Sequence, residues 1–263
     1  MNFDEANLHN LERLWEKYGA RQIAQGDSPE LSANTHWPHR CWLGWGEMSD
    51  EEILASLRDR AWVERWLEQV PESATLPLWP MQGENGVRGS ASNGLLLVEQ
   101  SLEVKNWVCA FEQVAMYLPL EKGRDYSAHL PVGFKVYPVL SQQAITEWVE
   151  VASAAFGYQI EPAVIEKLLD DSDIQILMAS YEGEPIASAL LLKTGDIMGV
   201  HQVGVKPGYQ GKGFARTLMT HIIAACASWR GNAIVLQASP KGRPLYDSLG
   251  FKAQFLIKNF QRV

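Results

Sequence analysis

The 263-residue sequence has few cysteines and no CxxC pair. Cys41, Cys109 and Cys226 are odd in number and widely spaced. Disulfide frameworks and structural zinc sites need paired or closely spaced thiols, so we expect three reduced thiols. His36 and His39 lie near Cys41, but no fourth ligand accompanies them. The sequence therefore predicts no metal site.

Long apolar runs are also missing. No run approaches the roughly 20 residues that a membrane helix needs. The acidic opening MNFDEANLHN lacks the basic and apolar regions of a signal peptide. The composition is 46% hydrophobic and 21% charged, which supplies enough apolar material for packed cores. We expect a soluble globular protein in the cytoplasm, with no membrane partner.

Positive charge is scarce, since the net charge is −8 and the sequence pI is near 5.3. Binding of nucleic acid through a general basic surface is therefore excluded. Both the acidity and most of the ten tryptophans belong to the first half of the chain. This asymmetry predicts an N-terminal α/β domain at 1–130 and a second domain at 131–263, joined through the turn-rich stretch Pro119–Pro131.

The first half gives an uneven pattern. The predicted elements are a helix over Leu8–Tyr18, a strand near Arg40–Leu43, a helix from the capping box Ser49–Glu52 to Pro71, a loop with at most one short strand over 71–94, a strand at Leu95–Val98 and a helix through Ala115. A strand and a helix follow again at 136–157. This similarity indicates either an internal repeat or two ordinary strand–helix units.

The second half is more regular. The predicted elements are a strand at Val136–Val139, a helix from Ser141 to Gly157, a short helix after Pro162, a hairpin of Ile174–Ser180 with Ile186–Lys193, a strand at Ile197–Lys206, a helix over Phe214–Trp229, a strand at Ala233–Ala238, a short helix at Pro244–Leu249 and a strand at Phe251–Lys258. This order predicts a mixed α/β layer.

A glycine-rich turn joins a strand to a helix at Val203–Arg216. Gly208, Gly211 and Gly213 allow backbone conformations in which successive N–H groups converge on one anion. The helix that follows adds unpaired donors and a partial positive charge. The turn fits neither a Walker P-loop nor a dinucleotide fingerprint. We predict a phosphate cradle, with a purely structural helix-entry turn as the alternative.

Two segments together resemble the GNAT superfamily of acetyl-CoA-dependent N-acetyltransferases. Gln210-x-x-Gly213-x-Ala215 is similar to the pyrophosphate loop of that family, and Leu245-Tyr246 with Leu249-Gly250-Phe251 is similar to its LYxxLGF segment. The resemblance covers about residues 134–258. It implies a mixed, mostly antiparallel sheet flanked by helices. The N-terminal half would be a second α/β unit, with a degenerate GNAT-like copy lacking the cofactor motif as one hypothesis.

The resemblance implies transfer of an acetyl group from acetyl-CoA to a primary amine in a ternary complex, without a metal. Tyr246 would be the general acid that protonates the leaving thiolate. Many members have Asn where this chain has Ser239, and Gly242 replaces a usual Ala. The implied cofactor-binding residues are Val203, Gly204, Val205, Gln210, Gly211, Lys212, Gly213, Phe214, Ala215, Arg216, Ser239 and Tyr246.

The acceptor amine must lose a proton before it attacks, since a lysine-like amine has a pKa near 10.4. His201, predicted to share a strand face with Val203 and Val205, is the first candidate for base or proton relay. A water chain and a structural histidine are the alternatives. Glu147 and Glu150 are weaker candidates, since exposed helix carboxylates are usually solvated surface charges.

The partners expected from the resemblance are acetyl-CoA and an amine acceptor, a small molecule rather than a protein, with the chain acting as a monomer or homodimer. A non-catalytic acyl-CoA-binding sensor or interaction module is the alternative function. An enzyme that uses a longer acyl chain would differ only in the depth of its pocket.

Overall fold

The computed structural model of the chain describes residues 2–23, 30–44, 55–56, 58–80 and 93–263. The chain forms two compact units. The first comprises Met1–Tyr18, Met116–Gln237 and Pro244–Lys252, and the second comprises Gly19–Ala115, Ala238–Arg243 and Ala253–Val263. This division differs from the sequence-based boundary between residues 130 and 131, because the N-terminal helix belongs with the C-terminal half.

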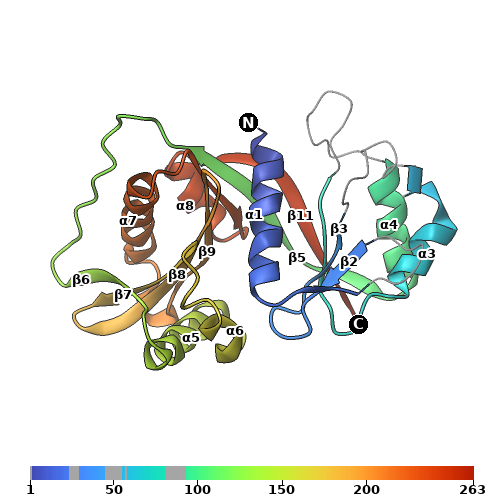
Figure 1. Ribbon diagram of the computed structural model, residues 1–263, viewed down its shortest axis with the longest axis horizontal. Helices are drawn as coiled ribbons and strands as arrows, with labels where there is room; N and C mark the ends of the chain where they lie inside the picture. The colour runs from blue at the N-terminus through green and yellow to red at the C-terminus, as the bar shows by residue number, and fades with distance from the viewer. Residues whose placement is uncertain (1, 24–29, 45–54, 57, 81–92) are drawn as a thin grey trace. The chain divides into compact units, whose positions relative to one another are not determined.

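The first unit is built on a mixed sheet (Figure 1). Its elements are α1 (Phe3–Lys17), β6 (Phe134–Pro138), α5 (Gln142–Phe156), α6 (Pro162–Glu166), β7 (Ile174–Tyr181), β8 (Glu184–Thr194), β9 (Ile197–Val205), α7 (Phe214–Ser228), β10 (Ala233–Ala238) and α8 (Arg243–Ser248). Its strands follow the order β5-β10-β9-β8-β7-β6, in which β5 (Trp107–Pro119) enters from the second unit.

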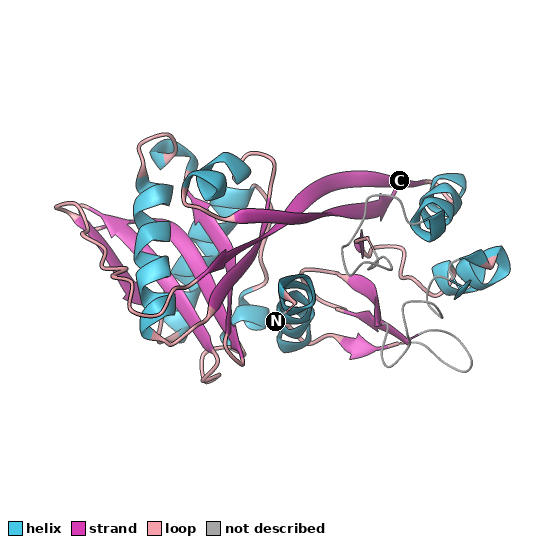
Figure 2. Ribbon diagram, turned by 90° about the horizontal axis from the view of Figure 1, so that it is seen from above, coloured by secondary structure: helices cyan, strands magenta, loops and turns pink. Residues whose placement is uncertain are grey.

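Strands β6, β7, β8 and β9 pair in an antiparallel manner, and β10 pairs with β9 in parallel. Helices lie on both sides of this sheet (Figure 2). The predicted mixed, mostly antiparallel sheet flanked by helices is confirmed.

Helix α5 shows how the sequence fixes the elements around the sheet. Ser141 Oγ accepts a hydrogen bond from the Ala144 N–H, and Gly157 ends the helix in the left-handed region at φ 77°. Both residues do what the sequence predicts. On the buried side of the helix, Trp148 is fully buried, and its Nε1 donates to Leu177 O on β7 at 2.9 Å. The helix is therefore attached to the sheet by an apolar surface and one directional bond.

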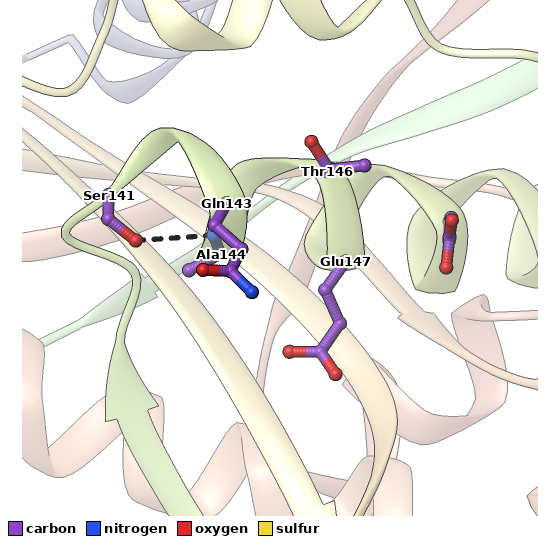
Figure 3. A pocket seen from close by; sticks show the side chains of 6 residues that line it. Ser141, Gln143, Ala144, Thr146 and Glu147 are labelled. Carbon is purple, nitrogen blue, oxygen red and sulfur yellow. Dashed lines mark hydrogen bonds between the residues drawn. The ribbon is translucent and has the colours of Figure 1, made fainter.

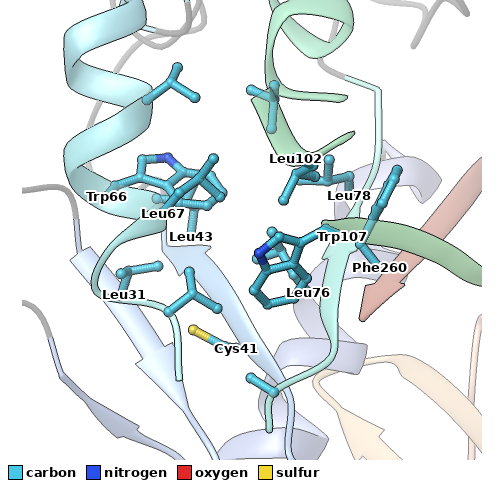
Figure 4. Packing of buried hydrophobic residues seen from close by; sticks show 14 of the residues in the cluster. Leu31, Cys41, Leu43, Trp66, Leu67, Leu76, Leu78, Leu102, Trp107 and Phe260 are labelled. Atoms are coloured by element: carbon cyan, nitrogen blue, oxygen red, sulfur yellow. The ribbon is translucent and has the colours of Figure 1, made fainter. Parts of the chain in front are cut away.

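The second unit has its own core. Its elements are β1 (Arg21–Gln22), β2 (Glu30–Ala33), β3 (Cys41–Gly44), α3 (Arg60–Leu67), β4 (Leu76–Leu78), α4 (Asn93–Val104), and most of β5 and β11 (Lys252–Arg262). Strands β1, β2 and β3 form an antiparallel sheet, while β11 lies between β4 and β5. Trp66 and Trp107 pack with Leu31, Leu76 and other aliphatic side chains (Figure 4).

Two predictions for the first half are wrong. The predicted strand Leu95–Val98 lies in α4, and the predicted helix through Ala115 is strand β5. A short apolar run such as Leu95–Val98 does not distinguish a buried strand from a helix, and leucine favours helices. Asn106, at φ 61°, separates the two elements. Residues 95–115 are thus a helix followed by a strand, which excludes the strand–helix repeat.

The helix predicted from the capping box Ser49–Glu52 is present in its later part as α3. The capping box itself lies outside the described residues. Asp59 caps α3, because its Oδ1 accepts from the N–H groups of Ala61 at 2.9 Å and Trp62 at 3.3 Å. Among the helices of the described ranges, none has both the length and the apolar character needed to cross a membrane.

We predict that Trp148→Ala lowers the free energy of unfolding by about 3–5 kcal/mol, because it opens a cavity and leaves Leu177 O without its donor. Urea unfolding followed by circular dichroism measures this loss. Gln143→Ala, an exposed change on the same helix, is the control and should stay within about 0.5 kcal/mol of wild type. Equal effects of the two changes would contradict the role of Trp148.

Candidate functional site

Strands β9 and β10 pair over only a short length. Their parallel register joins Ile197, Met198 and Gly199 to Ala233, Ile234 and Val235. Beyond Gly199 and Val235 both strands continue, to Val205 and Ala238, without further register partners between them. The two strands therefore separate in the direction of the glycine-rich turn, and the last part of β9 presents backbone that β10 does not cover.

A β-bulge interrupts β9 in this uncovered part. Leu190 of β8 lies opposite His201, and Ser188 lies opposite Gly204, so β9 contains one extra residue. Gln202 adopts φ 51°, and its carbonyl accepts a hydrogen bond from Ser188 Oγ at 3.0 Å.

The bulge shifts the alternation of side chains along β9. His201 and Gly204 share one face of the sheet, because their partners on β8 are two residues apart. A Cβ at Gly204 would lie 2.7 Å from Ala155 Cβ of α5, so this face is the one that α5 covers. The expectation that His201 shares a face with Val203 and Val205 is therefore wrong, since regular alternation does not hold across a bulge.

The glycine-rich turn has the backbone conformation of an anion cradle. Gly211 and Gly213 lie in the left-handed region at φ 77° and 84°. A Cβ built at either position meets nothing within 4 Å, so the space above the turn is open. Gly208 differs, because it lies in the 3₁₀ turn Pro207–Tyr209 and does not use a positive φ.

The N–H groups of six consecutive residues, Gly211 to Arg216, donate to no acceptor within the part of the chain that the structure describes. These donors include the first turn of α7, where the helix dipole places a partial positive charge. Lys212 and Arg216 are exposed beside them. The turn thus offers backbone donors and positive charge together, which suits a phosphate group.

Side chains on either side hold the turn in place. Gln210 Nε2 donates to Val205 O at 2.8 Å. The Phe214 ring lies 4.8 Å from the Tyr181 ring and 5.7 Å from the Phe134 ring, centre to centre. Arg216 Nη2 donates to Ser248 Oγ at 2.7 Å, which joins α7 to α8. Ala215, beside Phe214, is half-buried. Side-chain packing and hydrogen bonds therefore hold the turn in place, and its backbone N–H donors are not used in doing so.

Tyr246 lies on α8, half-buried, with its ring edge against Phe251 at 5.6 Å. Burial raises the pKa of Tyr246 to about 12, so the phenol is protonated at neutral pH. Within the described residues its hydroxyl has no hydrogen-bond partner. Ser239 is exposed, and its Oγ accepts from the Gly242 N–H at 3.1 Å, which fixes the turn into α8.

His201 is buried, and its Nε2 lies 2.9 Å from Asn10 Oδ1 on α1. Asn10 Nδ2 donates to Leu192 O at 3.1 Å and to Thr194 Oγ1 at 2.9 Å. Those two bonds direct Asn10 Oδ1 toward the imidazole, so Nε2 carries the proton. Burial lowers the pKa of His201 to about 4, although a hydrogen bond with Gln237 raises it. His201 is therefore neutral at pH 7.

Glu147 and Glu150 line an open hollow on α5 with Ser141, Gln143, Ala144 and Thr146 (Figure 3). Both carboxylates are exposed, whereas Trp148 and Val149 between them are buried. The two glutamates thus lie on the solvent side of the helix. Their carboxylates lie in solvent, whereas the buried side of α5 packs on the sheet face that carries His201.

Comparison with known families decides the identity of this region. Residues 136–261 match the family model described as "Acetyltransferase (GNAT) domain". This segment is a GNAT acetyltransferase domain. Acyl transfer is therefore the general chemistry associated with it. A comparison with curated protein sequences finds no match.

Solved structures share the fold over most of the chain. A GCN5-related N-acetyltransferase from Kribbella flavida is 14% identical, with a TM-score of 0.62 over 97% of this chain and 92% of that one. One from Sphaerobacter thermophilus is 13% identical, with a TM-score of 0.59 over 89% and 76%. A putative GNAT acetyltransferase from Novosphingobium aromaticivorans is 15% identical, with a TM-score of 0.52 over 95% and 96%. At these identities the likeness concerns the fold alone.

Sequence reasoning missed Asn7 and Asn10, which lie outside the GNAT domain and are fully buried. Their position was a signal, since both lie on the helix beside the apolar stripe of Leu8 and Leu11. A polar side chain on a buried helix face needs a hydrogen-bond partner. The sequence could therefore have predicted that Asn7 and Asn10 make buried hydrogen bonds, although it could not have predicted the groups that they bind.

The low pKa of His201 makes stability depend on pH. The folded-state pKa of about 4 lies below the unfolded value near 6.5. The contribution of His201 to the free energy of unfolding is therefore fully present above pH 6.5 and is lost as the pH falls toward 4. Between pH 7 and pH 4.5, we expect the free energy of unfolding of His201→Gln to fall by about 2.5 kcal/mol less than that of wild type. Urea unfolding at both pH values measures the difference, and equal losses would contradict it.

Proposed function

We propose that the GNAT domain transfers the acetyl group of acetyl-CoA to a primary amine, with a small-molecule amine as the acceptor. The observation that carries this proposal is the run of six unpaired backbone N–H donors, from Gly211 to Arg216, at the open end of the separation between β9 and β10. An acyl donor that carries a phosphate group and a long flexible arm fits both features. Its phosphate would bind the backbone donors of the turn, and its arm would lie between β9 and β10.

The residues that would hold acetyl-CoA fall into two groups. The turn from Gln210 to Arg216, which includes Lys212, Phe214 and Ala215, would bind the pyrophosphate through backbone donors and flanking charge. The backbone of Val203 and Gly204 and the N–H of Val205, whose carbonyl already accepts from Gln210, would pair with the amides of the pantetheine arm and with the acyl carbonyl. Ser239 is a weaker contact in this proposal, because its hydroxyl already accepts from Gly242.

Tyr246 suits the role of general acid. In the proposed reaction the neutral amine nitrogen bonds to the acyl carbon, the carbon–sulfur bond breaks, and the sulfur takes the Tyr246 hydroxyl proton. The nitrogen loses a proton to water, and water returns a proton to the Tyr246 phenolate. The raised pKa keeps the phenol protonated at neutral pH, so its hydroxyl can donate to the sulfur as the carbon–sulfur bond breaks. A hydroxyl already committed to a strong acceptor would be less available, and Tyr246 has no such partner within the described residues.

His201 does not suit the role of direct base. Its pKa of about 4 makes it a weaker base than an alkylamine by about six units, and its Nε2–H is bound to Asn10. We therefore assign proton removal from the acceptor to water and a positioning role to His201. A non-catalytic acyl-CoA sensor is the competing function, and the free, protonated hydroxyl of Tyr246 favours the enzyme over it.

We predict micromolar binding of acetyl-CoA and of CoA, with Gly213→Glu weakening both by about 30-fold or more, equivalent to about 2 kcal/mol. The new carboxylate would occupy the cradle and repel phosphate. Isothermal titration calorimetry measures the affinities. Gly183→Glu is the matched control, since Gly183 has φ 89° and an equally open Cβ position in a hairpin turn. Absence of binding in wild type would overturn the proposed function.

We predict that Tyr246→Phe lowers kcat by about 100-fold or more and leaves the acetyl-CoA affinity unchanged, because only the acid is lost. Thiol release from acetyl-CoA with a panel of primary amines measures turnover. Tyr126→Phe, whose hydroxyl accepts from the Glu121 N–H away from the cradle, should behave like wild type. Full turnover by Tyr246→Phe would exclude this residue as the acid.

A further inference from the structure

Four polar side chains meet where β9 and β10 separate. Asn7 and Asn10 come from α1, His201 from β9 and Gln237 from β10. Asn7 and Asn10 are fully buried, and His201 is 7% exposed. We call these four residues the polar wedge. All four belong to the first unit, and α1 lies outside the segment that matches the GNAT family.

Asn7 hydrogen-bonds β10 at the point where the pairing of β10 with β9 stops. The last register pair joins Val235 to Gly199, and the next carbonyl, Leu236 O, accepts from Asn7 Nδ2 at 3.4 Å. The same nitrogen donates to Met116 O on β5 at 3.0 Å. Gln237 Nε2 then donates to Asn7 Oδ1 at 2.6 Å. Through Asn7, helix α1 thus hydrogen-bonds the residues of β10 that follow its last register pair with β9.

Asn10 joins α1 to strands β8 and β9 by hydrogen bonds. It donates to Leu192 O and Thr194 Oγ1 on β8, and its Oδ1 binds His201 on β9. Gly199 makes room for this pair. A Cβ at Gly199 would lie 1.7 Å from Asn10 Oδ1 and 2.5 Å from His201 Nε2. The last paired residue of β9 must therefore be glycine for the wedge to lie against the sheet.

We infer that the polar wedge keeps β9 and β10 apart, so that α1 positions the β9 backbone from His201 to Val205 for the acyl donor. The inference rests on the proposed function. Asn7 binds Leu236 O, the first carbonyl after the last β9–β10 register pair, and Asn10 binds His201, two residues beyond Gly199. A longer β9–β10 ladder would have to displace these bonds. We assign them a positioning role, since their hydrogen bonds run to the strands and to one another.

The test compares apolar and polar replacements of similar size. Asn7→Leu and His201→Leu remove the wedge bonds, whereas His201→Gln retains a donor for Asn10 Oδ1. Leu14→Ala, a buried apolar change on α1, weakens the helix without touching the wedge. We expect acetyl-CoA affinity to fall about tenfold or more in the two leucine variants. It should stay near the wild-type value in His201→Gln and Leu14→Ala.

Amide hydrogen exchange without ligand gives a second measurement. We expect exchange at 200–205 and 236–238 to slow in the leucine variants, because the ladder extends once the wedge is lost. Unchanged affinity or faster exchange there would overturn the inference, as would equal weakening by Leu14→Ala. If Asn7→Leu does not fold, His201→Leu answers the same question. Wild-type protein that binds no acetyl-CoA would overturn the proposed function instead, and the exchange result would still test the separation of the strands.

Discussion

The early end of the β9–β10 pairing is the constraint on which the first unit depends. Three residue pairs join the strands, and then each strand continues without the other. Backbone groups inside a sheet need partners, so this separation would be costly if nothing replaced the ladder. Asn7 binds Leu236 O, and Gln210 binds Val205 O at the far end. In the proposed function, the acyl donor binds the β9 backbone beyond Gly199, which has no register partner on β10.

Glycines act at this site in two physically different ways. Gly199 and Gly204 are required by space, because a Cβ would overlap Asn10 at the first position and Ala155 at the second. Gly211 and Gly213 have open space and are required by their left-handed backbone. The first pair lets helices α1 and α5 approach the sheet, whereas the second pair turns N–H groups outward. In the sequence, only the spacing around Gly211 and Gly213 forms a motif. Gly199 and Gly204 are required by close packing, which leaves no local sequence pattern.

The sequence predicts the fold well where local signals agree. Ser141, Gly157, the hairpin at 181–185 and the glycine turn all mark the boundaries that the structure has. Leu95–Val98 and the segment up to Ala115 lacked such boundaries, and tertiary pairing with β11 decided the outcome. The bulge at Gln202 was equally invisible, because alternation predicts a face only for a regular strand. The stripe on α1 predicted a helix without indicating the sheet on which it packs.

Burial has opposite effects on the pKa values of Tyr246 and His201 and leaves both side chains neutral. It raises the pKa of the Tyr246 phenol and lowers that of the His201 imidazole, since each environment disfavours the charged form. Positive charge is provided instead at the cradle, by Lys212, Arg216 and the start of α7. In the proposed reaction, charge would therefore bind the phosphates at one end of the donor, while the neutral Tyr246 phenol would act at the other end. A thiol has a pKa near 8.5, so the departing thiolate is a weaker base than the Tyr246 phenolate. The neutral phenol would therefore stabilise the departing sulfur as a hydrogen-bond donor while the carbon–sulfur bond breaks, and the transfer of its proton would be completed as solvent reprotonates the phenolate.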